Sequence, residues 1–468
     1  MRVCVIGLGY VGFPTACLVA RAGHEVIGVD VNRSVIDRLA QGRLHIVNED
    51  GLAELAEAVL RSGRLRVATV PEPVDVFIIA VPTPFRPAQA VDEAAATSTS
   101  SPLDRPQGAA GLPGPDGRGP AGPSEPPFLA DLSFVEAAVR GLAPHVKPGN
   151  LVILESTVPP RTTEDVVRAT LEREGVDVAR VRFAHAPERV LPGNVVRELV
   201  DNDRIVGGLT PEDTRLACEF YRTFVRGEVV GTDAATAELV KLMENTFRDV
   251  NIALANEFAK VGEVLGIDVW EAIRLANRHP RVNFLRPGPG VGGHCIAVDP
   301  YFIAEVAPTV TPLIQTARMV NRGMPGHALE LLADLAGGRL PGRVAVLGAA
   351  YKADVGDDRE SPSYEVIRLL EERAVKVAVH DPHVERFRKP LEEVLAGAEA
   401  ILLLTDHRAY RSLDPCAAGR LVARRLLLDT RGFLEAAPWQ AAGFRVARLG
   451  AGILEVSPGN SEGRAGSG

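Results

Sequence analysis

A chain of 468 residues with 46% hydrophobic and 24% charged side chains can build two or three globular domains with sizeable cores. Its formal net charge of −8 argues against nucleic acid or an anionic membrane as a main partner, and its five scattered cysteines exclude a disulfide framework and a zinc motif. Because no apolar run reaches the ~18 residues of a membrane span, we expect a cytoplasmic protein.

The first 30 residues predict a strand, a glycine loop, a helix and a second strand. Residues 2–6 (RVCVI) are typical of a buried strand, GLGYVG follows, an apolar helix covers about 14–22, and HEVIGVD at 24–30 predicts the next strand. Glycines, a tyrosine and a proline interrupt the apolar start, which favours this βαβ unit over a signal peptide.

Gly7, Gly9 and Gly12 have the GxGxxG spacing of a dinucleotide-binding loop. The first glycine allows the tight turn, the second lets a pyrophosphate approach the backbone, and the third lets helix and strand pack closely. The helix N-terminus supplies N–H groups for the phosphates. Asp30 suits ribose hydroxyls and favours NAD over NADP, although Arg33 leaves NADP open.

Further strands are predicted over 74–84, 150–157 and the first part of 181–194, with an amphipathic helix near 162–173. Between them, residues 86–127 change character, because 15 of these 42 residues are Gly or Pro. Such a composition builds no core, so we expect a disordered or loosely held insertion there.

The second half begins with a helical pattern over 211–278, including one long helix near 233–264. After Pro325 an alternating α/β pattern returns. Its strands are expected over 343–352, 375–382 and 398–407, and its helix over 361–373.

The predicted fold class is therefore α/β, with two Rossmann-like doubly wound domains joined by a long central helix. We expect an NAD-binding domain over 1–210, a central helical domain over 211–325 and a second Rossmann-like domain over 326–456. The tail 457–468 is expected to be unstructured.

Lys241 and Asn245 share one face of the long helix, and Arg248 follows on that face. Charged residues on helices usually form a solvated face, whereas the apolar flanks here suggest an enclosed stretch. From the residues alone, both a solvated face and a functional stripe remain open.

Cys295 lies shortly after two glycines in PGPGVGGHCIAVDP at 287–300, with Asp299 four residues later. Glycine permits close backbone approach, which a nucleophile that meets a substrate needs and a packed structural cysteine does not. Neighbouring residues on an extended chain point to opposite faces, so we do not expect His294 and Cys295 to form an ion pair. The three arginines of the longer segment RHPRVNFLRPGPGVGGHC at 278–295 suit a phosphorylated ligand.

Together these segments resemble the nucleotide-sugar 6-dehydrogenases, the group of UDP-glucose and GDP-mannose dehydrogenases. The resemblance covers the chain apart from 86–127 and the tail, and the insertion departs from the family's pattern. The shared motifs are GLGYVG at 7–12, VPTP at 81–84, ESTVP at 155–159, APERVLPG at 186–193, AELVKLMENTF at 237–247, GVGGHCIAVDP at 290–300 and GAAYKADVGDDRESPS at 348–363.

The resemblance implies a four-electron oxidation of the sugar C6 alcohol to a carboxylate by two NAD⁺. Cys295 would trap the aldehyde as a thiohemiacetal that becomes a thioester. Lys241 and Asn245 would serve the first oxidation, Asp299 would orient Lys241 or a water, and Glu188 with Thr157 would assist thioester hydrolysis.

The resemblance also implies binding residues for both ligands. For the cofactor they are Gly7, Gly9, Tyr10, Val11, Gly12, Asp30, Thr83 and Thr157; for the UDP-sugar they are Arg189, Val190, Lys241, Asn245, Arg248, His279, Arg281, Gly292, Tyr351, Lys352 and Arg359. The second α/β domain would hold UDP, the substrate would meet the cofactor between the two domains, and the long helix would mediate a homodimer.

The sequence GGHC resembles the branch that acts on UDP-N-acetylhexosamines, because UDP-glucose enzymes usually carry Ser before the cysteine and Lys before the aspartate, where this chain has His294 and Val298. The implied substrate is UDP-N-acetyl-D-mannosamine, oxidised for a surface polysaccharide, with UDP-N-acetylglucosamine as the alternative. Less favoured interpretations are a two-electron β-hydroxyacid dehydrogenase and an inactive nucleotide-binding module. The first needs no covalent trap, and the second would not need Lys241, Asn245 and Cys295 together.

Overall fold

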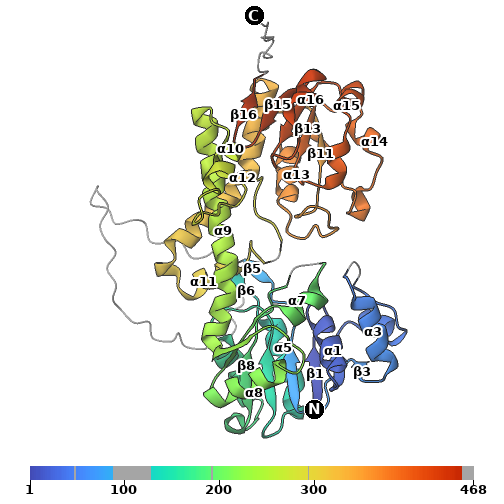
Figure 1. The fold of residues 1–468 in the computed structure, drawn as a ribbon, viewed down its shortest axis with the longest axis vertical. Coiled ribbons are helices and arrows are strands. Elements are labelled where there is room, and N and C mark those ends of the chain that lie inside the picture. The colour runs from blue at the N-terminus through green and yellow to red at the C-terminus, as the bar shows by residue number, and fades with distance from the viewer. Residues whose placement is uncertain (47–48, 88–127, 191–192, 294, 456–468) are drawn as a thin grey trace, which may run out of the picture. The chain divides into compact units, whose positions relative to one another are not determined.

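The computed structural model describes residues 1–46, 49–87, 128–190, 193–293 and 295–455 (Figure 1). Its contacts divide the chain into two compact units: Met1–Asn245 with Val298–Pro312, and Thr246–Ala297 with the chain from Leu313 onward. The expected insertion from 88 to 127, His294 and the tail 457–468 lie outside the described residues.

The first unit is built on an eight-stranded sheet in the order β10-β9-β8-β7-β4-β1-β2-β3. Neighbouring strands are parallel except β8 and β9, which are antiparallel. The strands are β1 (Arg2–Ile6), β2 (Glu25–Val29), β3 (Leu65–Ala68), β4 (Val76–Ile79), β7 (Leu151–Leu154), β8 (Arg182–His185), β9 (Arg204–Gly208) and β10 (Val229–Asp233). The strand order reverses between β1 and β4, and ligands of open α/β sheets bind at the carboxyl ends of such a pair.

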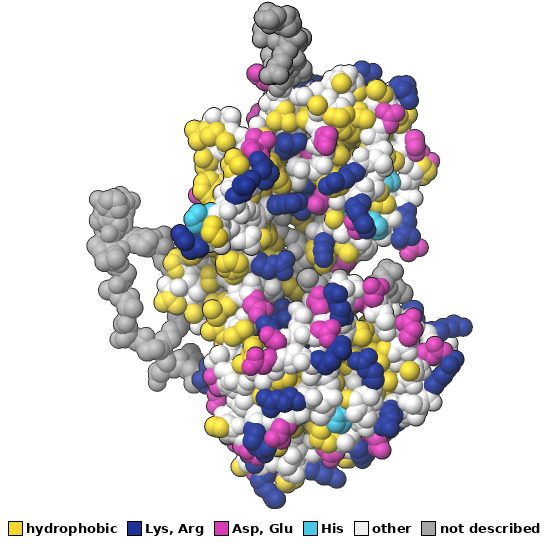
Figure 2. All heavy atoms as spheres, in the orientation of Figure 1, with side chains coloured by type: hydrophobic (Ala, Val, Ile, Leu, Met, Phe, Trp, Pro, Cys, Tyr) yellow, Lys and Arg dark blue, Asp and Glu magenta, His cyan; other side chains and the backbone are white. Residues whose placement is uncertain are grey.

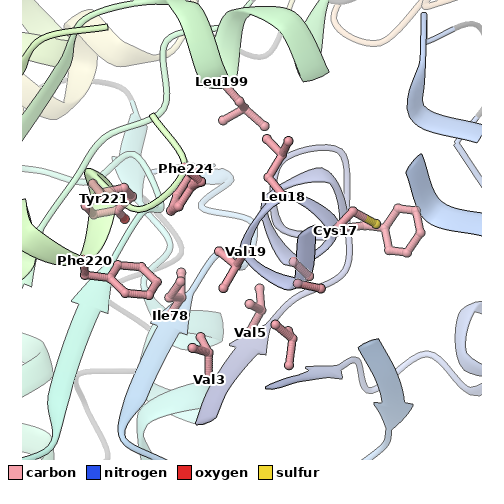
Figure 3. Packing of buried hydrophobic residues seen from close by; sticks show 14 of the residues in the cluster. Val3, Val5, Cys17, Leu18, Val19, Ile78, Leu199, Phe220, Tyr221 and Phe224 are labelled. Atoms are coloured by element: carbon pink, nitrogen blue, oxygen red, sulfur yellow. The ribbon is translucent and has the colours of Figure 1, made fainter. Parts of the chain in front are cut away.

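Helices cover both faces of this sheet, and the pleat of β1 explains why both faces are apolar. Val3 and Val5 join one hydrophobic cluster, whereas Cys4 and Ile6 join the other. Figure 3 shows the first cluster, in which Val3 and Val5 pack near Val19 of the first helix. The helices are α1 (Gly12–Arg21), α2 (Arg33–Ala40), α3 (Leu52–Arg61), α5 (Ser133–Leu142), α6 (Ala169–Arg173), α7 (Val195–Asp201), α8 (Pro211–Tyr221) and α11 (Asp299–Val306).

Three strands of this sheet differ from the predicted elements. β3 and β9 were not predicted, and β10 interrupts the region 211–278 that was expected to be helical. β9 and β10 contain glycine, which weakens the strand signal, yet glycine is required in β9. A Cβ at Gly207 would lie 2.1 Å from the carbonyl oxygen of Asp233 in β10.

The predicted insertion also starts too early. Phe85–Pro87 forms β5, which pairs antiparallel with β6 (Phe128–Ala130). The two strands are held by aromatic packing, since the ring of Phe128 lies 4.7 Å from that of Phe85 and 5.2 Å from that of Tyr301 in α11. Arg86 and Pro87 therefore belong to the fold rather than to the insertion.

The predicted long helix is α9 (Ala234–Leu265), a continuous helix of 32 residues. The boundary between the two units falls inside it, after Asn245. Among the described residues, no helix combines the length and the hydropathy that crossing a bilayer requires.

The second unit contains a six-stranded sheet in the order β12-β11-β13-β14-β15-β16, parallel except for β16. Its strands are β11 (Arg343–Leu347), β12 (Lys376–His380), β13 (Ala400–Leu403), β14 (Leu426–Asp429), β15 (Arg445–Arg448) and β16 (Gly452–Leu454). Its helices are α10 (Val269–Ala276), α12 (Pro312–Ala336), α13 (Pro362–Glu372), α14 (Leu391–Leu395), α15 (Pro415–Leu421) and α16 (Ala436–Ala441). The predicted α/β class with parallel sheets and a long helix is confirmed.

The sequence predicted that the second α/β region starts after Pro325, but Pro325 does not mark its start. It lies inside α12, which continues to Ala336. Met324, Ala328 and Leu332 of this helix are fully buried, so tertiary packing outweighs the local cost of a proline within a helix.

Candidate active site

The glycine loop after β1 has the geometry that a dinucleotide requires. Gly7 has φ +93°, and a Cβ there would lie 2.5 Å from the carbonyl oxygen of Ala80. A Cβ at Gly12 would lie 1.9 Å from the carbonyl oxygen of Gly7, whereas one at Gly9 would meet nothing within 4 Å. The chain's own packing needs the first and third glycines, and exposed Gly9 leaves backbone open to a ligand.

Asp30, at the end of β2, faces this loop and is only partly buried. Its carboxylate accepts hydrogen bonds from the backbone N–H groups of Leu8 and Asn32, both at 2.8 Å. These bonds hold the side chain beside the loop while leaving it accessible. The residues present therefore fit the nucleotide half of a dinucleotide cofactor.

Other predicted cofactor residues are brought to the carboxyl ends of β4 and β7. The hydroxyl of Thr83 donates to the carbonyl oxygen of Thr157 at 2.6 Å, and that of Ser156 donates to Val81 at 2.7 Å. The VPTP and ESTVP motifs are thus one structural feature. Tyr10 and Val11 lie half-buried at the start of α1.

Lys241, Asn245 and Asp299 come together in the first unit. Asn245 on α9 and Asp299 at the start of α11 are both buried, and the Asn245 amide donates to the Asp299 carboxylate at 2.5 Å. Burial raises the pKa of Asp299 to about 6, although the charge of Lys241 and the Asn245 hydrogen bond oppose this rise. The polar stripe on α9 is therefore enclosed at Asn245, half-buried at Lys241 and exposed at Arg248.

Glu188 is held by the backbone of Arg189, a predicted substrate residue, and by Arg204, which the sequence did not single out. One carboxylate oxygen accepts the backbone N–H of Arg189 at 2.6 Å, and the other accepts the guanidinium of Arg204 at 2.8 Å. Arg204 also donates to Glu155 at 2.7 Å. Arg204 opens β9, a strand that the sequence did not predict, and its carboxylate partners come from other strands.

Arg189 and Val190, predicted to bind substrate, have partners within the first unit. The Arg189 guanidinium donates to the carboxylate of Glu244 at 2.7 Å and also to the carbonyl oxygen of Asp203. Val190 packs against the first hydrophobic cluster.

In the second unit, the glycines before Cys295 are packed against residues 351–362. A Cβ at Gly290 or Gly292 would lie 2.8 or 2.5 Å from the ring of Pro362, and one at Gly293 would lie 3.1 Å from the ring of Tyr351. The sequence analysis explained these glycines by substrate access. The structure gives a different reason, since each leaves room for this neighbouring segment.

Cys295 itself is half-buried and opens a turn over 295–298. The prediction that His294 and Cys295 do not form an ion pair stays a prediction, because His294 lies outside the described residues. Cys295 is close enough to Tyr351 and Arg359 to interact electrostatically with both. Burial raises the pKa of Tyr351.

The remaining predicted substrate residues are mostly exposed cations of the second unit. Arg359 is paired with Asp357 through two hydrogen bonds of 2.9 and 2.7 Å. Lys352 is exposed, and so are His279 and Arg281, which are joined by a 3.3 Å bond from the Arg281 N–H to the His279 ring.

Comparison with known proteins identifies the family of this chain. The chain matches three domains of the UDP-glucose/GDP-mannose dehydrogenase family: the NAD binding domain over 1–105 and 121–225, the central domain over 235–323 and the UDP binding domain over 345–436. The chain belongs to this family. It is an NAD-dependent nucleotide-sugar dehydrogenase, as the sequence predicted.

Relatives match over nearly the whole chain. The chain is 41% identical to a UDP-N-acetyl-D-mannosamine dehydrogenase of Methanococcus maripaludis, covering 96% of this chain and 97% of that protein. It is 43% identical to an NDP-N-acetyl-D-galactosaminuronic acid dehydrogenase of Ralstonia nicotianae, covering 93% and 96%. A solved structure of UDP-D-ManNAc dehydrogenase from Pyrococcus horikoshii is 38% identical, with a TM-score of 0.83 and coverage of 97% and 100%.

Proposed function

We propose that this enzyme oxidises the C6 alcohol of UDP-N-acetyl-D-mannosamine to the uronate, through a thioester on Cys295. The observation that carries the proposal is the buried Asn245–Asp299 hydrogen bond beside Lys241, with Cys295 four residues before Asp299. A base, an oxygen-binding amide and a nucleophile are the groups that this four-electron oxidation needs.

In the first oxidation, Lys241 takes the proton of the C6 hydroxyl while Asn245 donates a hydrogen bond to the oxygen. Asp299 holds the Asn245 amide in place. NAD⁺, when bound, accepts the hydride that leaves C6 in each oxidation. Gly9 and Asp30 hold it, because open backbone suits the pyrophosphate and a carboxylate suits the ribose.

In the second oxidation, the Cys295 sulfur adds to the aldehyde carbon and forms a thiohemiacetal. Loss of its hydroxyl proton to Lys241 and of its C6 hydride gives the thioester. Water, deprotonated by Glu188, then releases the carboxylate and restores the thiol. Overall, one alcohol and one water become a carboxylate, two NADH and three protons.

The choice of sugar is supported by the relatives named UDP-N-acetyl-D-mannosamine dehydrogenase and by the GGHC sequence. The Ralstonia relative makes UDP-N-acetylgalactosamine the second candidate, because oxidation of its C6 alcohol gives a galactosaminuronate. UDP-N-acetylglucosamine remains the third sugar to compare. We further propose a cytoplasmic location, supported by the five free cysteines, and a role in surface polysaccharide synthesis.

We also propose that the enzyme is a homodimer formed through α9. Six large apolar side chains recur along this helix at helical spacing and are 37–64% exposed: Leu239, Met243, Phe247, Leu254, Phe258 and Val261. Figure 2 shows hydrophobic side chains gathered where α9 and α10 reach the surface. Such a stripe on a helix favours burial against an identical copy.

The decisive experiment measures NADH formed per sugar consumed for the wild type and for Cys295→Ser, with UDP-ManNAc, UDP-GlcNAc and UDP-GalNAc in parallel. We expect two NADH per sugar on UDP-ManNAc, and no complete turnover by the variant. One NADH per sugar, unaffected by the substitution, would overturn the thioester mechanism. A preference for either other sugar would overturn the substrate assignment alone.

A further inference from the structure

Arg204 sits between two buried glutamates in the first unit. Its guanidinium donates to Glu155 at 2.7 Å and to Glu188 at 2.8 Å, and the three side chains are 5%, 0% and 9% exposed. Buried charges are costly unless they are paired and hydrogen-bonded, and here the one guanidinium provides the pairing for both carboxylates.

The antiparallel strand β9 explains how Arg204 reaches this place. Glu155 follows β7 and Glu188 lies just beyond β8, at the carboxyl ends of two parallel strands. Because β9 runs the other way, its first residue lies at the same edge. The register that pairs His185 with Gly207, continued by three residues, sets Glu188 opposite Arg204.

The other members of the cluster restrict Arg204. The Tyr221 hydroxyl donates to the same Glu155 oxygen at 2.7 Å, and the guanidinium carbon of Arg204 lies 4.5 Å from the Tyr221 ring centre. Glu155 and Tyr221 therefore fix the guanidinium from the buried side. Glu188, the most exposed of the three charged groups, takes its orientation from a donor that is already immobile.

We propose that Arg204 is a positioning residue that acts through Glu188 in thioester hydrolysis; this rests on the function proposed above. With one oxygen held by Arg204 and the other by the Arg189 N–H, the Glu188 carboxylate has a single orientation. The remaining lone pairs then face the water from which it takes a proton. Neither oxidation step requires Glu188, so the role is confined to hydrolysis.

The experiment compares Arg204→Lys, Glu188→Gln and the double variant by rapid-mixing measurement of NADH and by intact mass. Lysine keeps the charge but cannot bridge both carboxylates as the planar guanidinium does. We expect a fast burst of two NADH per active site, followed by turnover slowed about 100-fold with KM unchanged. The mass of the acyl group should appear on the enzyme and be absent when Cys295 is replaced by Ser.

The double variant separates a positioning role from a general structural one. If Arg204 acts through Glu188, adding Arg204→Lys to Glu188→Gln slows hydrolysis no further. Arg215→Lys is the matched control, because Arg215 pairs with the exposed Glu212 and Glu219 on the surface of α8 and the substitution should keep the wild-type hydrolysis rate. Should Arg204→Lys not fold, the pair Arg204→Met with Glu155→Met removes the buried charges together and should give the same burst.

Slower first-hydride transfer without acyl-enzyme, additive effects in the double variant, or unchanged turnover would each overturn the inference. Failure of the proposed function looks different, since the wild type would then produce one NADH per sugar.

Discussion

The two parallel sheets of this protein begin with the same junction between strand and loop. Gly7 follows β1 with φ +93°, and its N–H donates to the end of β2 at 2.8 Å. Gly348 follows β11 with φ +99°, and its N–H donates to the end of β12 at 2.9 Å. In each sheet the next N–H donates to an aspartate that follows the second strand, Asp30 or Asp381.

The two aspartates then differ. Asp30 is partly exposed and accepts two backbone bonds, whereas Asp381 is fully buried. Asp381 accepts four backbone N–H groups and the ring of His407, so nothing of it is left for a ligand. Although burial opposes the change, these hydrogen bonds lower the pKa of Asp381.

The helix after each loop differs as well. α1 begins at Gly12, directly after its loop, whereas α13 begins only at Pro362, well beyond the end of β11. The first loop therefore offers a helix N-terminus to a phosphate and the second does not. The comparison teaches that a doubly wound sheet becomes a dinucleotide site only when its loop and carboxylate stay open to a ligand.

Asp381→Ala should have the largest effect, because it breaks the second junction. Loss of a carboxylate that satisfies five donors should lower the free energy of unfolding by about 4 kcal/mol. NADH binding per folded molecule should stay unchanged. Urea unfolding and NADH fluorescence titration measure the two quantities, and a loss of NADH affinity would contradict the division of roles.

Gly12→Ala should break the first junction. A Cβ placed 1.9 Å from the Gly7 carbonyl oxygen forces the backbone to shift, which should cost about 3 kcal/mol and abolish tight NADH binding. Gly9→Ala is the control, since its Cβ meets no atom within 4 Å. It should keep wild-type stability and still weaken NADH binding. Equal stability of the two variants would refute the packing role of Gly12.

Asp30→Asn tests whether the more exposed of the two carboxylates contributes to cofactor binding rather than to stability. The amide keeps the size of the side chain but loses the charge that suits ribose hydroxyls. We expect about tenfold weaker NADH binding, equivalent to about 1.4 kcal/mol, with little change in melting temperature. Isothermal titration with NADH and NADPH checks this. Unchanged NADH affinity would remove Asp30 from the cofactor site.

The pH dependence of stability compares Asp381 with another buried aspartate, Asp299. The pKa of Asp299 is raised to about 6 from an ordinary value of 3.8, so its ionisation destabilises the folded state as pH rises from about 4 to 6. Asp381 has the opposite effect. Because its pKa is lowered in the folded state, its ionisation contributes stability, and that stability is lost as pH falls below the ordinary pKa of an aspartate.

Asp299→Asn should therefore be less destabilised than the wild type as pH rises from 4 to 7, by about 2 kcal/mol. Urea unfolding at pH 4, 5, 6 and 7 measures the slope for both proteins. Identical slopes would show that Asp299 does not titrate as its burial implies.

The first junction could be predicted from sequence because its signals are local. The glycine spacing, the apolar strand and the aspartate at the end of the next strand all lie within the first 30 residues. Asn245 and Asp299 were predicted to act in one site only through family resemblance, since the two residues lie 54 positions apart. Arg204 could not be recognised, because a buried guanidinium is explained only by carboxylates that other strands bring to it.

Strands β9 and β10 were missed for a related reason. Their glycines are required by contacts with other elements, and a strand that contains glycine loses the apolar alternation on which prediction depends. Pro325 caused the opposite error, because the sequence predicted a boundary there whereas α12 continues through it. The tendency of proline to end a helix is outweighed by the packing of the buried face of α12.

The packing of the glycines before Cys295 has an evolutionary consequence. Gly290, Gly292 and Gly293 leave room for Tyr351 and Pro362, which lie some 60 to 70 positions later in the chain. A side chain at one of these glycines therefore requires that Tyr351 or Pro362 moves or is replaced by a smaller residue. The glycine loop before Cys295 and the segment 351–362 are expected to change together in evolution, which limits the substitutions that this loop can accept one at a time.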